Sequence, residues 1–252
     1  MKVLIKISYL GTAYCGYQVQ PNGVSIQQKL NEATLATFGY DCDIVGCSRT
    51  DSGVHANEFC ATVAKRGTES LPTAIPIERI PLAISAYLPA DICVFAAEWV
   101  PDTFHARYDV KEKEYLYRFY NRGVRSPFEE GRSAHIPKPL DEKDVDSMNQ
   151  AAQSLCGKQD FAAYMAQGSS VKSTVRTVTR AEVFREGDCV ILRIAADGFL
   201  YNMVRIIAGT LLAVGQGKLT VEDVKNITVS RDRSLAGSTM AACGLYLNRV
   251  VY

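Results

Sequence analysis

Residues 48–56 read Ser-Arg-Thr-Asp-Ser-Gly-Val-His-Ala, between strand-like runs at 44–47 and 58–64. We therefore expect a tight turn between two strands, and Gly53 permits turn conformations that a β-carbon resists. The turn places the carboxylate of Asp51 two residues after the guanidinium of Arg49. An opposite charge nearby favours the ionised form of a carboxylic acid. An ionised carboxylate shielded from water is a candidate nucleophile or base.

Local chemistry also permits a structural interpretation of this turn. An Arg-x-Asp sequence in a loop is typical of a surface ion pair or of an aspartate that stabilises a turn. Taken alone, the residues around Asp51 favour that interpretation, so the rest of the chain must decide.

The composition is that of an ordinary globular protein: 252 residues, 47% of them apolar and 22% charged. The net charge of +1 argues against a protein that is basic over its whole surface. Nucleic-acid binding would need the Lys and Arg side chains gathered in one cleft. The first ten residues read as a strand and not as a secretion signal. Polar residues interrupt the longest apolar run, 199–214, so we expect no membrane span.

The eight cysteines include no C-x-x-C pair, and the three histidines are scattered, so we expect no metal site. Cysteines within apolar runs, such as Cys60 and Cys189, are expected as buried thiols. A reducing, cytoplasmic location suits them.

Strand and helix patterns alternate twice along the chain. The first series has a strand at 2–9, a helix capped by Ser25 and ended by Gly39, the two strands around the turn, a short helix after 72–81, and a strand at 92–100. The second has a strand at 114–120, a helix from Asp141 stopped by Gly157, a hairpin at 179–195, helices at 200–214 and 220–227, and a strand at 244–250. This order predicts an α+β protein with mixed sheets and two halves, divided near 101–107.

The stretch 48–56 resembles the signature of the tRNA pseudouridine synthase A family, whose usual form is Gly-Arg-Thr-Asp-Ala-Gly-Val-His. Further blocks that are similar to the family follow in order at 9–20, 88–92, 104–108, 113–117, 155–161, 198–205 and 241–252. Several ordered blocks are far more specific than one. The departures are Leu10 for aspartate, Tyr201 for histidine, Lys113 for arginine, and Ser48 and Ser52 for glycine and alanine. They leave Asp51, Tyr115 and Arg205 in place, and they leave the substrate range open.

The resemblance implies two ferredoxin-like halves with mixed antiparallel sheets joined side by side and an active cleft between them. Residues 1–104 would carry the catalytic aspartate, and residues 105–252 the cleft's tyrosine and arginine and the dimer interface. It also implies an isomerase that converts uridine to pseudouridine at positions 38–40 of tRNA, in the anticodon stem-loop. The protein would be a cytoplasmic homodimer that needs no cofactor and no metal.

The resemblance also assigns roles. Asp51 would be the catalytic carboxylate, either as a nucleophile at the sugar or as a base that removes the 2′ hydrogen; the sequence leaves both routes open. Arg49 would guide the flipped nucleotide, and Arg205 would pair with Asp51 and lower its pKa. Tyr115 would stack on the uracil. From pattern alone, Tyr115 is also typical of an ordinary strand tyrosine, and Arg205 of a side chain that reaches solvent from a helix edge.

We expect His55 and His105 to be structural. An RNA-binding set is expected at Arg107, Arg118, Arg122, Arg125, Lys172 and Arg176, although each alone is typical of a solvated surface charge. Residues 168–170 read as a loop that could close over an RNA arm or form a surface turn.

Two other functions compete with this one. A non-catalytic RNA-binding module is favoured by Leu10, where the family has aspartate. An aspartate-based hydrolase is disfavoured because no cluster of Asp residues surrounds Asp51.

Overall fold

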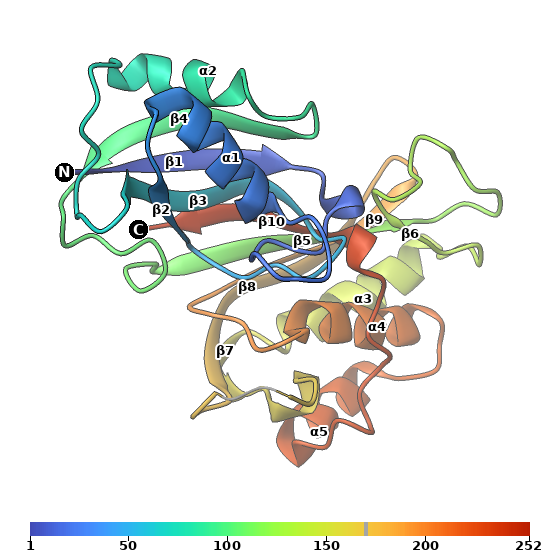
Figure 1. Cartoon of the computed structure of the whole chain (residues 1–252). Coiled ribbons are helices and arrows are strands. Elements are labelled where there is room, and N and C mark those ends of the chain that lie inside the picture. Colours follow the sequence, from blue (N-terminus) through green and yellow to red (C-terminus); the bar gives the residue numbers. More distant parts are fainter. Residues whose placement is uncertain (169–170) are drawn as a thin grey trace. The chain divides into compact units, whose positions relative to one another are not determined.

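The computed structural model describes residues 1–168 and 171–252 and forms two compact units (Figure 1). Unit 1 comprises Met1–Lys111 and Leu247–Tyr252, and unit 2 comprises Glu112–Tyr246. The last six residues, which the sequence analysis placed in the second half, lie in unit 1 because the last strand pairs with a strand of that unit.

Unit 1 has the element order of a ferredoxin-like fold. Its elements are β1 (Lys2–Tyr9), α1 (Ile26–Phe38), β2 (Cys42–Gly46), β3 (His55–Lys65), α2 (Ile80–Ser85) and β4 (Ile92–Val100). β1 lies between β4 and β3, and β2 pairs with the end of β3; these pairs are antiparallel. β10 (Leu245–Val251) also pairs with β3.

The helices of unit 1 cover one face of its sheet, with α1 and α2 packed against each other (Figure 1). α1 begins where expected, because the side chain of Ser25 accepts a hydrogen bond from the backbone N–H of Gln28 at 3.2 Å. It ends at Gly39, whose φ of 74° is left-handed. Val3, Ile5 and Ile7 alternate along β1 and are fully buried, so the predicted strand pattern is confirmed.

Unit 2 repeats the order strand, helix, strand, strand, helix in β5, α3, β8, β9 and α4. Its elements are β5 (Glu112–Tyr120), β6 (Ala134–His135), α3 (Glu142–Gln153), β7 (Gly157–Asp160), β8 (Val175–Glu186), β9 (Cys189–Ala196), α4 (Met203–Gly215) and α5 (Val221–Ser230). The sheet order β5-β9-β8-β7 is antiparallel, and β6 pairs parallel with β5. The α+β class with two ferredoxin-like halves is confirmed.

The end of α3 and the start of α4 differ from the sequence prediction. α3 ends at Gln153, and Gly157, expected as its stop, begins β7 with a φ of 102°. α4 begins at Met203 and not at 200, because Asn202 has a left-handed φ of 59°.

No helix in residues 1–168 and 171–252 is long and apolar enough to cross a membrane.

Candidate active site

The turn that carries Asp51 connects β2 to β3. The N–H of Val54 donates to the carbonyl of Asp51 at 3.2 Å, and Gly53, the third residue of this turn, has a φ of 78°. A β-turn with positive φ at its third residue favours glycine. Asp51 is half-buried and Arg49 is exposed. The sequence prediction of a tight turn between two strands is therefore confirmed.

A second segment of unit 1, residues 14–17, holds this turn through backbone atoms. The carbonyl of Tyr14 accepts hydrogen bonds from the N–H of Gly53 at 3.3 Å and from the hydroxyl of Ser52 at 3.2 Å. The N–H of Tyr17 donates to the carbonyl of Thr50 at 3.1 Å. The backbone at Gly16 passes so close that a β-carbon there would lie 2.6 Å from the carbonyl oxygen of Thr50.

Buried side chains fix both ends of the turn. The hydroxyls of Tyr9 and Thr50 are hydrogen-bonded at 2.8 Å, and both residues are buried. His55 has no exposed surface, and its Nδ1 accepts the N–H of Gly11 at 2.9 Å. This geometry gives His55 a structural partner.

Asp91, the residue directly before β4, anchors Tyr14. The hydroxyl of Tyr14 donates to the carboxylate of Asp91 at 2.6 Å. Burial, with a contribution from Asp91, raises the pKa of Tyr14 well above its ordinary value. Tyr14 is therefore a neutral donor, and its backbone carbonyl stays in place beside the Asp51 turn.

Tyr115 lies in β5 of unit 2, opposite Ile194 of β9. It is 7% exposed, and the ring of Phe199 meets it edge-on, with centroids 5.0 Å apart and planes at 83°. Tyr117 and Phe119 are fully buried on the same face of the strand. The predicted shared face is confirmed, and β-strand periodicity is its cause.

Arg205 occupies the first turn of α4 in unit 2 and is half-buried. Its Nε donates to the carbonyl of Met240 at 2.7 Å, and one terminal nitrogen donates to the side-chain oxygen of Asn202 at 2.8 Å. Both acceptors are uncharged. These two bonds orient the guanidinium of Arg205.

Met240 and Ala241, which follow α5, contact Arg205 and Tyr117 of β5 respectively. Met240 binds Arg205 through both its carbonyl and its N–H, and the carbonyl of Ala241 accepts the hydroxyl of Tyr117 at 2.7 Å. Sequence reasoning missed Met240 and Ala241, because they act through backbone atoms and leave no side-chain signal. The structure thus groups Arg205 and Tyr117 within unit 2, and Asp51 and Arg49 within unit 1.

Comparison with known proteins was made over the whole chain. A family model described as tRNA pseudouridine synthase matches residues 151–252. A tRNA pseudouridine synthase A of Thermoanaerobacter sp. (strain X514) is 43% identical over 250 residues, which cover 99% of each chain. The chain belongs to the tRNA pseudouridine synthase A family. Its members are isomerases.

A second relative of similar identity supports membership in this family. A tRNA pseudouridine synthase A of Ruminiclostridium cellulolyticum is 42% identical over 252 residues and covers 100% of this chain and 99% of that relative. A solved structure titled "Crystal Structure of a Cbf5-Nop10-Gar1 Complex" matches 97% of this chain and 48% of that chain, with a TM-score of 0.39 and 13% identity.

Departures of this tRNA pseudouridine synthase A family member from the usual motif lie near these groups: Ser52 supplies the hydroxyl that donates to the carbonyl of Tyr14, and Leu10 and Tyr201 lie close by in the sequence. Leu10 is half-buried, and its N–H donates to the carbonyl of Asp91 at 2.9 Å. Tyr201 is 48% exposed, directly before Asn202, which binds Arg205. The side chains of Leu10 and Tyr201 take no part in the hydrogen bonds described above for the Asp51 turn and for Arg205.

The basic residues expected to bind RNA have different surroundings. Arg107 lies in unit 1; the others lie in unit 2. Arg122 is paired with Asp188 at 2.7 Å, Arg118 lies 3.6 Å from Glu129, and Arg125 lines a cavity of about 390 Å³ with Glu129. A carboxylate next to an arginine offsets part of its positive charge, so these three arginines should bind phosphate more weakly.

Two positions in that expected set remain. Arg176 donates to the carbonyls of Ser173 and Val175, and Lys172 is exposed. Of the loop expected at 168–170, Ser169 and Ser170 lie outside the described residues. No group of His, Cys, Asp and Glu in the described residues has the arrangement of a metal site.

Proposed function

We propose that this protein is a tRNA pseudouridine synthase that isomerises uridine at positions 38–40, in the anticodon stem-loop, with Asp51 as the catalytic carboxylate. The observation that carries the proposal is 43% identity to a tRNA pseudouridine synthase A over 99% of both chains. The turn around Asp51, held by backbone bonds to Tyr14 and Tyr17, supports the assignment of the carboxylate.

The reaction defines what the site must supply. The bond from C1′ of the ribose to N1 of the base breaks, and the same carbon joins C5 of the base, so no group is imported. A carboxylate is needed at the sugar, with donors that stabilise developing charge and a pocket that holds the detached base. Asp51 acts either by attacking the sugar or by removing the 2′ hydrogen.

Two residues of unit 2 would act together with Asp51 in the proposed site. Arg205, oriented by Met240 and Asn202, pairs with Asp51. Tyr115, backed edge-on by Phe199, stacks on the uracil. The orientation of each side chain by neighbours reduces the entropy lost on binding.

The target uridine must leave its stack, which costs a few kcal/mol. Arg49, exposed beside the turn, guides the flipped nucleotide by filling the gap or by binding a phosphate. Arg107 contributes to binding the substrate from the same unit.

We also propose that the protein works in the cytoplasm, where its substrate is, as a homodimer. Unit 2 would carry the dimer interface, and Val229 on α5, 82% exposed, offers it apolar surface. Sedimentation as a monomer at micromolar concentration would reject the dimer.

The test of the catalytic assignment compares Asp51→Asn with wild type on unmodified tRNA. We expect the variant to bind tRNA with unchanged affinity and to form no pseudouridine. Asp146→Asn, at an exposed position of α3, is the matched control and should keep full activity. Pseudouridine formed by purified Asp51→Ala would reject Asp51 as the catalytic group. A wild-type protein that binds tRNA and forms no product would instead support the non-catalytic RNA-binding module.

A further inference from the structure

An exposed tyrosine follows β4 in unit 1 and is held in place by its neighbours. Tyr108 is 75% exposed. Its ring lies against that of His105, with centroids 4.2 Å apart and planes at 30°. The guanidinium carbon of Arg107 lies 5.9 Å from the centroid of the same ring. An aromatic ring and a cation are thus presented together at the surface.

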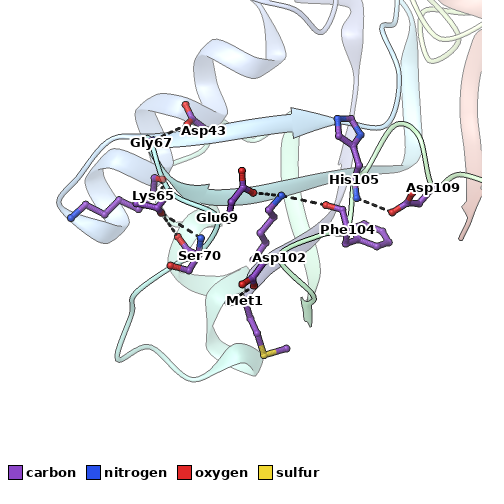
Figure 2. A network of polar contacts seen from close by, with 12 residues as sticks. Met1, Asp43, Lys65, Gly67, Glu69, Ser70, Asp102, Phe104, His105 and Asp109 are labelled. Carbon is purple, nitrogen blue, oxygen red and sulfur yellow. Dashed lines mark hydrogen bonds and ion pairs between the residues drawn. The ribbon is translucent and has the colours of Figure 1, made fainter.

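His105 organises the turn that presents them. Its N–H donates to the carboxylate of Asp109 at 2.8 Å, as Figure 2 shows, and the N–H of Asp109 donates back to its carbonyl at 3.1 Å. Its Nδ1 accepts the N–H groups of Arg107 at 3.1 Å and Tyr108 at 3.3 Å. Through these two bonds Nδ1 holds the backbone of Arg107 and Tyr108 in the turn. His105 is therefore a positioning residue.

The base of this turn is anchored to the rest of unit 1. Ala106 is fully buried, and its carbonyl accepts the hydroxyl of Tyr252 at 2.8 Å. The ring of Phe104 lies 4.9 Å from that of Tyr252. The ammonium of Lys2 donates to the carbonyl of Phe104 at 3.4 Å (Figure 2). These contacts hold the backbone next to Tyr108 in place.

We propose that Tyr108 and Arg107 form a stacking platform for an unpaired base of the substrate RNA, other than the uridine that reacts. Single-stranded RNA is bound by aromatic side chains that stack on bases, combined with cations that contact the backbone. Tyr108 offers the ring, and Arg107 binds the adjoining phosphate. Because the turn fixes both residues, little conformational entropy is lost on binding. This inference rests on the proposed function only in that the substrate is RNA.

The test measures the Kd of the full-length protein for an unmodified tRNA transcript, and the single-turnover rate of pseudouridine formation. Tyr108→Ala should raise the Kd between about 5-fold and about 150-fold, the range for loss of one base–aromatic stack. Tyr108→Phe should bind like wild type. Arg107→Ala should weaken binding and reduce the salt dependence by about one phosphate contact. Tyr87→Ala, at a tyrosine 59% exposed after α2, is the control and should change nothing.

Variants of His105 separate positioning from general stability. His105→Ala removes the acceptor and should raise the Kd, whereas His105→Asn supplies an oxygen near the position of Nδ1 and should restore binding. Wild-type affinity in Tyr108→Ala would overturn the platform. So would a changed oligomeric state with unchanged RNA binding, because Tyr108 would then belong to a protein interface.

Failure of the platform and failure of the proposed function have different signatures. If wild type forms pseudouridine and Tyr108→Ala does so with unchanged Kd, the platform is rejected and the function stands. If wild type forms no pseudouridine but Tyr108→Ala weakens tRNA binding, the platform stands and the activity is rejected.

Discussion

Gly16 offers a direct way to move the turn that carries Asp51 without changing Asp51 itself. Its φ is 84°, and an added β-carbon would lie 2.6 Å from the carbonyl oxygen of Thr50. A left-handed conformation at a residue other than glycine costs roughly 1–2 kcal/mol. Ordinary contact begins at 3.4 Å, so Gly16→Ala must displace the turn by 0.8 Å or bend the segment that holds it.

The displacement predicts a specific kinetic result. A misplacement of about 1 Å at a reacting group can lower the rate by about 100-fold. Gly16→Ala should therefore lose about 100-fold in the single-turnover rate while tRNA affinity changes little. Its free energy of unfolding should fall by roughly 1–2 kcal/mol or more, which leaves a fold of ordinary stability intact. Urea unfolding and pseudouridine formation under saturating enzyme measure the two effects.

Gly39 is the matched control. Its φ is 74°, and an added β-carbon would meet nothing within 4 Å. Gly39→Ala should lose similar conformational stability and keep the wild-type rate. A wild-type rate in Gly16→Ala would refute the reasoning, as would an equal loss of rate in both variants.

Two further predictions concern unit 2. Tyr117→Phe removes the 2.7 Å bond from the buried Tyr117 to the carbonyl of Ala241, so stability should fall by about 1 kcal/mol. The rate should fall too, because the adjacent Met240 orients Arg205, and an unchanged rate would show that this contact does not matter for the reaction. The hydroxyl of Thr174, with smaller contributions from its other partners, holds the pKa of Asp160 below its ordinary value. The stability that Asp160 contributes is therefore present above about pH 4 and lost as the pH falls through the folded-state pKa. Urea unfolding at several pH values should show a smaller acid loss in Asp160→Asn, and identical curves would reject the contribution.

The sequence predicts elements whose ends are set by local chemistry. Ser25 and Gly39 delimit α1 as expected, because a side-chain cap and a left-handed glycine act within one helical turn. Where the boundary depends on tertiary structure, the prediction fails. Gly157 begins a strand that pairs with β8, and the left-handed Asn202 delays α4. No local pattern reveals that the C-terminal strand returns to pair with β3.

In the candidate site, too, the sequence predicts some features and leaves others to the fold. Asp51 and Arg49 are identified by the resemblance of a short motif, and Tyr115 by its strand pattern and a second motif. The groups that hold them are mostly backbone carbonyls, such as those of Tyr14 and Met240, and any residue type supplies a carbonyl. The sequence therefore predicts which side chains take part in the reaction, and only the folded chain shows which atoms orient them.

The nature of those holding atoms has a consequence for catalysis. The bonds described around the Asp51 turn and around Arg205 use neutral acceptors: the carbonyls of Tyr14 and Met240 and the amide of Asn202. Such bonds fix the position of the groups that they hold, and the rate of a chemical step depends steeply on the position of the reacting groups. A site held in this way depends on geometry. Substitutions that disturb the holding segments should therefore reduce the rate of the chemical step more than the affinity for RNA, which exposed cations and rings supply.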